Sequence, residues 1–222
     1  MLLRSIFLKE WLKIRWYWLL ALLLNLGMLV YLYIDIRHQF HVEHSEMIWY
    51  WAFELRRLLY TSIKYLPVFT GIMLAAAQFG PEMINGRFRL SLHLPLRDDM
   101  LVWTWVMFGA LMSGIIALMD AIGLYFVIAG WFPHEAAVSA VLTAVPWLQA
   151  GWVAYFGTTL VLLEPQPLRR LTYLGLSIAF IALLYMERGY QEYDQVIITF
   201  ALMGLLFIPA VVLPAHRYRH RS

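Results

Sequence analysis

Three histidines in one polar segment of this sequence could bind a metal. His38, His41 and His44 stand three residues apart, and carboxylates lie among them at Asp35, Glu43 and Glu46. Imidazole and carboxylate ligands suit Zn, Cu or Ni. Side chains spaced three residues apart shift steadily around the helix axis, whereas a metal prefers two ligands at positions i and i+4 or ligands in a folded loop. We therefore favour a hydrated, weakly pH-sensitive loop over a metal site.

Asp120 is the second residue with chemical potential, because it lies deep in an apolar run between Met119 and Ala121. An ionisable side chain in such a place normally faces the interior of a helix bundle or water. Asp120 is then a candidate for a translocation path or a proton relay. Alternatively, it lies near the outer end of a span, and residues 121–131 form a re-entrant or interfacial segment. Sequence reasoning leaves both interpretations open.

The composition indicates that these residues belong to a membrane protein. Of the 222 residues, 62% are hydrophobic and 14% are charged, against roughly half and a quarter in a soluble domain. Ten tryptophans and thirteen tyrosines suit the two membrane interfaces. The chain has no cysteine, which excludes disulfides, thiolate metal sites and cysteine nucleophiles. We expect an all-α polytopic protein with one transmembrane domain over residues 1–222.

Six apolar runs are candidates for spans, which need about 20 residues each. They are Trp16–Ile34, Tyr65–Pro81, Met100–Trp131, Ala136–Leu163, Leu171–Tyr185 and Val196–Leu213. The third run is too long for an upright helix and too short for two spans with a loop, so we expect one long or bent helix. Pro146 is expected to kink the fourth.

Two segments outside the spans are expected to lie on the membrane surface. Residues 1–15 alternate apolar and charged positions at roughly helical spacing, which predicts an amphipathic helix on an anionic interface. A basic flank of the first span would explain the charges equally well. Residues 35–64 are expected to form an extracytoplasmic loop followed by an amphipathic helix, because burying Glu54, Arg56 and Arg57 in lipid would be expensive.

Lysine and arginine counts predict the orientation. With the N-terminus in the cytoplasm, twelve of these residues fall inside: Arg4, Lys9, Lys13, Arg15, Arg87, Arg89, Arg97, Arg169, Arg170, Arg217, Arg219 and Arg221. Five fall outside: Arg37, Arg56, Arg57, Lys64 and Arg188. Both termini are then cytoplasmic, and residues 82–99 form a cytoplasmic loop.

Polar and small residues within the spans predict contacts between helices. Glu82 is expected to pair with Arg87, and Glu164 with Arg169 or Arg170. Gln78 and Gln149 are expected to form hydrogen bonds between helices. Small residues permit close packing and suggest a dimer interface; they are Gly109, Ser113, Gly114, Gly151, Ala154 and Gly157.

Sequence signatures of catalysis are absent. The chain contains no G-x-x-x-x-G-K-[ST] loop and no G-x-G-x-x-G, H-E-x-x-H or G-x-S-x-G pattern. We therefore expect no enzyme activity and no ATP hydrolysis by this chain alone. Active transport would need an ion gradient or another subunit.

The stretch "EMINGRFRLSLHLPLRDD", residues 82–99, interrupts the apolar pattern with charge. An acidic residue at the end of a span is followed by a Gly, a Leu-Pro pair and a basic residue, at Glu82, Gly86, Leu94, Pro95 and Arg97. With this order and the N-terminal "FLKEWLKIRW", the chain resembles the permease subunit of ABC-2 type transporters. The additional His93, Asp98 and Asp99 depart from that pattern.

The resemblance implies six spans, an interfacial N-terminal helix and a short coupling helix that docks on a cytoplasmic ATPase. We expect the docking residues to be Glu82, Gly86, Arg87, Phe88, Arg89, Leu92, Leu94, Pro95 and Arg97. The apolar side chains would anchor the loop, and the arginines would supply polar contacts. The alternation also fits a short strand or an interfacial loop, and a solvated basic loop would explain the arginines alone.

The function implied by the resemblance is export by alternating access, with a dimer of permease chains, identical or not, and two copies of a separate ATPase. ATP and Mg²⁺ would bind to the ATPase, and this chain would need no cofactor and no nucleic acid. Its place would be the inner or plasma membrane, as a multi-pass protein. The alternative is a gradient-driven transporter using Asp120, or a membrane-embedded assembly factor, with no ATPase partner.

Overall fold

The computed structural model describes residues 2–84, 98–186, 189–211, 213–214 and 217, and every regular element in this part of the chain is a helix. The five long elements are α1 (Leu2–Val42), α3 (Leu66–Ile84), α5 (Asp98–Ala129), α6 (His134–Leu163) and α7 (Pro167–Leu184). The short ones are α2 (Ser45–Trp49), a π-helical turn (Tyr50–Glu54), a 3₁₀ turn (Thr61–Ile63), α8 (Ile197–Leu205) and α9 (Phe207–Ala210).

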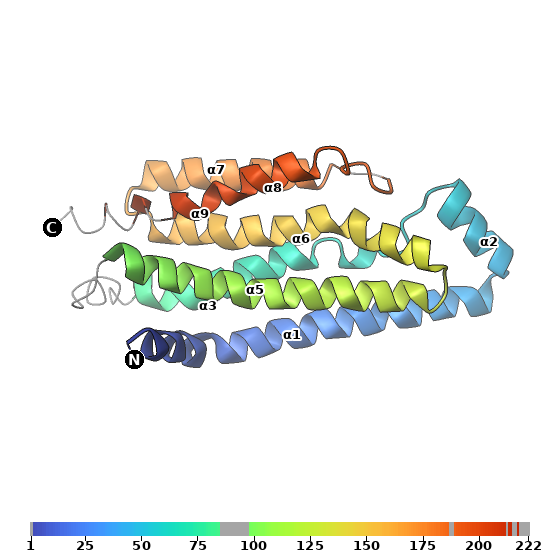
Figure 1. Cartoon of the computed structure of the whole chain (residues 1–222), viewed down its shortest axis with the longest axis horizontal. Coiled ribbons are helices and arrows are strands. Elements are labelled where there is room, and N and C mark those ends of the chain that lie inside the picture. Colours follow the sequence, from blue (N-terminus) through green and yellow to red (C-terminus); the bar gives the residue numbers. More distant parts are fainter. Residues whose placement is uncertain (1, 85–97, 187–188, 212, 215–216, 218–222) are drawn as a thin grey trace.

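The five long helices are long and apolar enough to cross a membrane, which indicates a multi-pass membrane protein, and each coincides with one of the expected spans. Successive long helices run in opposite directions (Figure 1). The first turn of α1, the end of α3, the start of α5 and α9 therefore lie at one end of the bundle, and α2 lies at the other. We call the end of the bundle that contains α9 the loop end, because residues 85–97 connect α3 to α5 there.

The third apolar run forms one continuous helix, α5, rather than a span with a re-entrant segment. Its 32 residues measure about 48 Å at 1.5 Å per residue, against about 30 Å for the hydrocarbon core of a bilayer. Its three glycines, Gly109, Gly114 and Gly123, do not interrupt it. Helix α6 likewise continues through the buried Pro146, so the proline expected to kink the fourth span ends no helix there.

The sixth apolar run is divided into two helices. Its part from Ile197 to Ala210 is apolar but, at about 21 Å, shorter than a span. The break falls at Leu206, between α8 and α9. Pro209 explains it, because a proline has no N–H to donate to the carbonyl four residues earlier, at Leu205, and its ring clashes with that carbonyl.

The described part of the N-terminal segment, residues 2–15, belongs to α1 and is continuous with the first span. Glu10 and Ile14 are buried against the bundle, whereas Phe7, Leu8 and Leu12 are exposed. The charged side chain of Glu10 in this segment therefore faces the protein and not the lipid. At its other end, α1 continues to Val42, two turns beyond the expected span.

Helix α6 is central to the bundle and packs on α3, α5, α7, α8 and α9. Its approach to α3 is closest at Gly71 and Gly151, where a Cβ added to Gly71 would lie 2.1 Å from the Gly151 carbonyl oxygen. A Cβ on Gly109 would overlap the Tyr155 hydroxyl, and one on Gly157 would overlap Ser177. These small residues thus serve packing within the chain, where the sequence suggested contact with a second copy.

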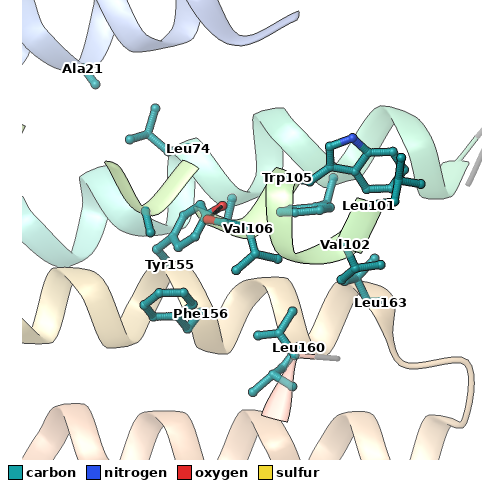
Figure 2. Close-up of a cluster of buried hydrophobic side chains, with 14 of the residues drawn as sticks. Ala21, Leu74, Leu101, Val102, Trp105, Val106, Tyr155, Phe156, Leu160 and Leu163 are labelled. Carbon is teal, nitrogen blue, oxygen red and sulfur yellow. Dashed lines mark hydrogen bonds between the residues drawn. The ribbon is translucent and has the colours of Figure 1, made fainter. Parts of the chain in front are cut away.

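The core at the loop end is formed by α1, α3, α5 and α6. Figure 2 shows its side chains, with Tyr155 and Phe156 of α6 beside Val106 of α5. A second core at the opposite end joins Leu32 and Ile36 of α1 to Trp147 of α6 and to the short helical turns after α2.

Candidate functional site

A cluster of buried charges joins α1 to α3 at the loop end. Lys13 Nζ lies 3.2 Å from Glu82 Oε1 and 3.0 Å from Glu10 Oε2. Lys9 Nζ lies 3.3 Å from the same oxygen of Glu82. The side chains of Glu10 and Glu82 are 1% and 7% exposed. Two carboxylates and two ammonium groups balance, which is the condition for keeping such charges out of water.

Gln78 extends this cluster to the other two helices. One turn before Glu82 on α3, its Nε2 donates to Glu10 Oε2 at 3.0 Å and to the Trp105 carbonyl of α5 at 2.9 Å. Its Oε1 accepts from the Tyr155 hydroxyl of α6 at 2.8 Å. The expected hydrogen bonds between helices are thus confirmed for Gln78, and they connect four helices through one amide.

A glycine makes this arrangement possible. A Cβ on Gly109 would lie 1.9 Å from the Tyr155 hydroxyl and 2.2 Å from Gln78 Oε1. A residue with a side chain at position 109 would displace either the phenol of Tyr155 or the amide of Gln78. We call the whole group, Lys9, Glu10, Lys13, Gln78, Glu82 and Tyr155, the charge cluster.

The charge cluster lies directly before the segment predicted to bind a partner. Glu82, the first of the predicted docking residues, belongs to both. The other eight lie outside the described residues; they are Gly86, Arg87, Phe88, Arg89, Leu92, Leu94, Pro95 and Arg97. The expected pairing of Glu82 with Arg87 also lies outside them, and within the described residues Glu82 forms salt bridges with Lys9 and Lys13 of α1.

Sequence reasoning missed the charge cluster because it assigned the lysines to the membrane surface. The spacing of Ile6, Glu10, Lys13 and Ile14 follows one helical face, which was a usable signal. That face carries both apolar and charged residues, so it matched an interfacial helix as well as a buried one. The 69 residues between Lys13 and Glu82 hid their contact.

A second buried glutamate at the same end pairs differently from its prediction. Glu164 is fully buried, and its Oε2 accepts from Arg217 Nη1 at 2.8 Å. Arg217 also donates to the Tyr173 hydroxyl at 3.3 Å. The predicted partner Arg170 contacts only the backbone carbonyl of Glu164. Glu164 follows the last residue of α6, where the chain changes direction. Arg217, which is distant in sequence, therefore binds the carboxylate, and the nearby Arg170 binds the backbone carbonyl.

Asp120 lies inside the bundle and is 7% exposed. Within the described chain, its Oδ1 has no hydrogen-bond partner. It borders two cavities of about 10 Å³ each, one shared with Leu29 and Trp147, the other with Thr70 and Ser113. Such a volume holds about one water molecule. The predicted path residue is therefore enclosed in this conformation, on a helix that is continuous on both sides of it.

Asn25, which lies near Thr70, resembles Asp120 in having a side-chain oxygen without a hydrogen-bond partner among the described residues. Asn25 is fully buried on α1, and its Nδ2 donates to Thr70 Oγ1 at 2.9 Å and to the Ala21 carbonyl at 2.8 Å. Its Oδ1 accepts nothing from the described residues. The interior of the bundle thus contains two acceptor oxygens, and a water molecule would satisfy either of them.

The three histidines are not gathered into one site. His38 and His41 lie on the exposed end of α1, and His44 precedes α2. No group of three or more metal-ligating side chains is assembled within the described residues.

Gln149 of α6 borders an apolar groove of about 430 Å³ between α5, α6 and α8. Its Nε2 faces Gly204 and has no hydrogen-bond partner among the residues described. The expected hydrogen bond to another helix is therefore not formed there.

No protein-family model, no curated protein and no solved structure matches this chain.

Proposed function

We propose that this chain is the membrane-spanning permease subunit of an ABC exporter of the ABC-2 type. Residues 85–97 would form the cytoplasmic segment that docks on a separate ATPase, and two permease chains would act with two ATPase copies. Substrate would pass by alternating access between the two permease chains. The observation that carries this proposal is the charge cluster at the root of that segment.

The charge cluster supports the proposal because it could transmit a displacement from the segment into the bundle. Glu82 lies three residues before the segment begins and is held by Lys9 and Lys13 of α1. Gln78, one turn further along α3, contacts α5 and α6. A force on residues 85–97 would therefore act on four helices together. A basic loop serving only as a topological anchor would need no such connection.

The topology we propose has six spans and both termini in the cytoplasm. Helices α8 and α9 together would provide the sixth span, tilted or in a locally thinned bilayer, since they are shorter than the hydrocarbon core. Residues 1–15 would lie at the cytoplasmic interface with Phe7, Leu8 and Leu12 toward the lipid, and the membrane would be the inner or plasma membrane of the cell.

We expect Phe88 to be the central anchor of this segment, so truncating its side chain tests the proposal. Phe88→Ala should weaken copurification of the proposed ATPase partner, or uncouple its hydrolysis from transport, because interface energy concentrates in buried aromatic residues and truncating one costs upward of ~1 kcal/mol. Arg87→Ala and Arg89→Ala should act more mildly if they lie at the rim, where salt screens them. Phe69→Ala, an exposed phenylalanine of α3, is the matched control.

The measurement is pull-down of the ATPase in detergent together with substrate-stimulated ATP turnover. Equal values for wild type, Phe88→Ala and Phe69→Ala would reduce residues 85–97 to a positive-inside anchor and remove the main mechanistic support of the proposal.

A gradient-driven transporter is the second candidate, favoured by the unpartnered, enclosed carboxylate of Asp120. Uptake or release by vesicles containing this chain alone, under an imposed proton gradient and without ATP, would favour this candidate over the first.

A further inference from the structure

A cavity of about 390 Å³ lies at the end of the bundle opposite the loop end. Its walls come from three distant parts of the chain, residues 52–60, 128–140 and 190–191. Small-molecule sites occupy about 300–1,000 Å³. The cavity therefore has the size of a binding site, and it lies where α5 ends and α6 begins, so it would be at the level of lipid headgroups when these helices span a bilayer.

The cavity is lined mainly by aromatic and aliphatic side chains, including Phe53, Tyr60, Phe132 and Tyr190. The rings of Tyr60 and Tyr190 meet edge to face with centroids 6.4 Å apart. The Tyr190 hydroxyl donates to the Arg57 carbonyl at 3.0 Å, which joins the 189–196 connection to the segment before α3. Hydrogen bonding and ring packing thus hold two of the three wall segments together.

Two charged side chains of opposite sign border the cavity, Arg56 and Glu135. Neither forms a salt bridge or a side-chain hydrogen bond to any other residue that the structure describes. Burial raises the pKa of the Tyr190 phenol, so that hydroxyl remains a neutral donor. The cavity therefore presents one cation and one anion, and neither neutralises the other.

The backbone of this region is also unusual. Arg56 has a φ of 49° and Gln191 a φ of 55°, and both residues line the cavity. Left-handed backbone at a residue other than glycine is strained and concentrates at binding sites. At position 56 a glycine would relieve the strain but would not supply a guanidinium.

We propose that this cavity binds the zwitterionic headgroup of a membrane phospholipid, with its phosphate at Arg56 and its ammonium at Glu135. A ligand with both charges would satisfy both side chains, guanidinium being well suited to phosphate oxygens. The aromatic walls would contact the ammonium by cation–π attraction and the glycerol and upper acyl carbons by apolar packing. This site is independent of the proposed ATPase partner.

The test measures lipid binding to the purified full chain by native mass spectrometry from a neutral maltoside detergent. The probes are dihexanoyl phosphatidylethanolamine, dihexanoyl phosphatidylglycerol and glycerophosphoethanolamine, which carries the headgroup without acyl chains. We expect one tightly bound phosphatidylethanolamine per chain, and weaker binding of the other two probes. Equal binding of glycerophosphoethanolamine would overturn the assignment to a lipid.

Charge-neutral variants locate the site. Arg56→Gln and Glu135→Gln should each weaken phosphatidylethanolamine binding roughly fivefold, because partly exposed charge pairs contribute up to about 1 kcal/mol. Phosphatidylglycerol has no ammonium group, so its binding should respond to Arg56→Gln and not to Glu135→Gln. The controls are Arg57→Gln, whose side chain stacks on Trp51 outside the cavity, and Glu46→Gln in the first turn of α2.

Arg56→Gly separates binding from folding. It removes the charge and relieves the positive φ, so it should raise thermal stability while weakening lipid binding as much as Arg56→Gln does. If the control variants weakened binding as much as the cavity variants, or if Arg56→Gly bound phosphatidylethanolamine like wild type, the proposal would be wrong.

Discussion

Replacing Lys13 by methionine should destabilise the protein far more than the same replacement of Lys9. Both ammonium groups lie at nearly the same distance from Glu82 Oε1, 3.2 Å for Lys13 and 3.3 Å for Lys9. Their side chains differ in exposure, 18% for Lys13 and 51% for Lys9. Lys13 also lies 3.0 Å from Glu10, so its removal leaves two buried carboxylates with less compensation.

The expected magnitudes follow from this difference in burial. Removing one partner of a buried ion pair costs about 3–5 kcal/mol, whereas an exposed pair contributes about 0.2–1 kcal/mol. Lys9 continues to compensate Glu82, which places Lys13→Met at the lower limit, about 3 kcal/mol. Lys9→Met should lose less than about 1 kcal/mol. Methionine preserves most of the aliphatic stem, so packing changes little in either variant.

The free energy of unfolding is measured in mixed micelles by titration with a denaturing detergent, followed by far-UV circular dichroism. The double variant Lys13→Met, Glu82→Gln removes a carboxylate together with the ammonium group and should lose less than the sum of the two single variants. Equal losses for Lys9→Met and Lys13→Met would refute the reasoning that burial determines the strength of this cluster.

Two further predictions concern helix packing and Asp120. Gly71→Ala would bring a Cβ within 2.1 Å of the Gly151 carbonyl oxygen and should cost about 1–3 kcal/mol, while Gly80→Ala on the same helix meets nothing within 4 Å and should gain up to about 1 kcal/mol. Detergent unfolding of both variants checks the opposite signs, and shifts in the same direction would contradict the close packing of α3 on α6. Asp120→Asn removes a charge at nearly constant size and should preserve expression and folding while lowering transport. Unchanged transport with normal expression would leave Asp120 a structural residue.

Local pattern was sufficient to predict the long helices. Helix α6 begins at His134 and ends at Leu163, against a predicted Ala136–Leu163, because an apolar run in a membrane protein can bury its backbone only as a helix. The break at Leu206 was not predicted, although Pro209 was visible. Tertiary packing decides whether a proline bends a helix, breaks it or is tolerated within it, and Pro146 and Pro209 have different outcomes in the same chain.

The charge cluster and the cavity were beyond prediction for a different reason. Lys13 and Glu82 are 69 residues apart, and each had a satisfactory local explanation, a lipid headgroup for one and a neighbouring arginine for the other. Arg56 and Glu135 likewise look like ordinary surface charges. Only the arrangement of helices shows that two of these residues neutralise one another and that the other two do not.

The hydrogen bond between Gln78 and Tyr155 has a consequence for how the helices assemble while the chain is being synthesised. The tyrosine is added to the chain 77 residues after the glutamine, which takes about 4–15 s at 5–20 residues per second. During that interval α3 enters the bilayer with the amide oxygen of Gln78 lacking its phenol donor. Helix α3 can therefore complete its polar contacts only after α6 has been added to the bundle.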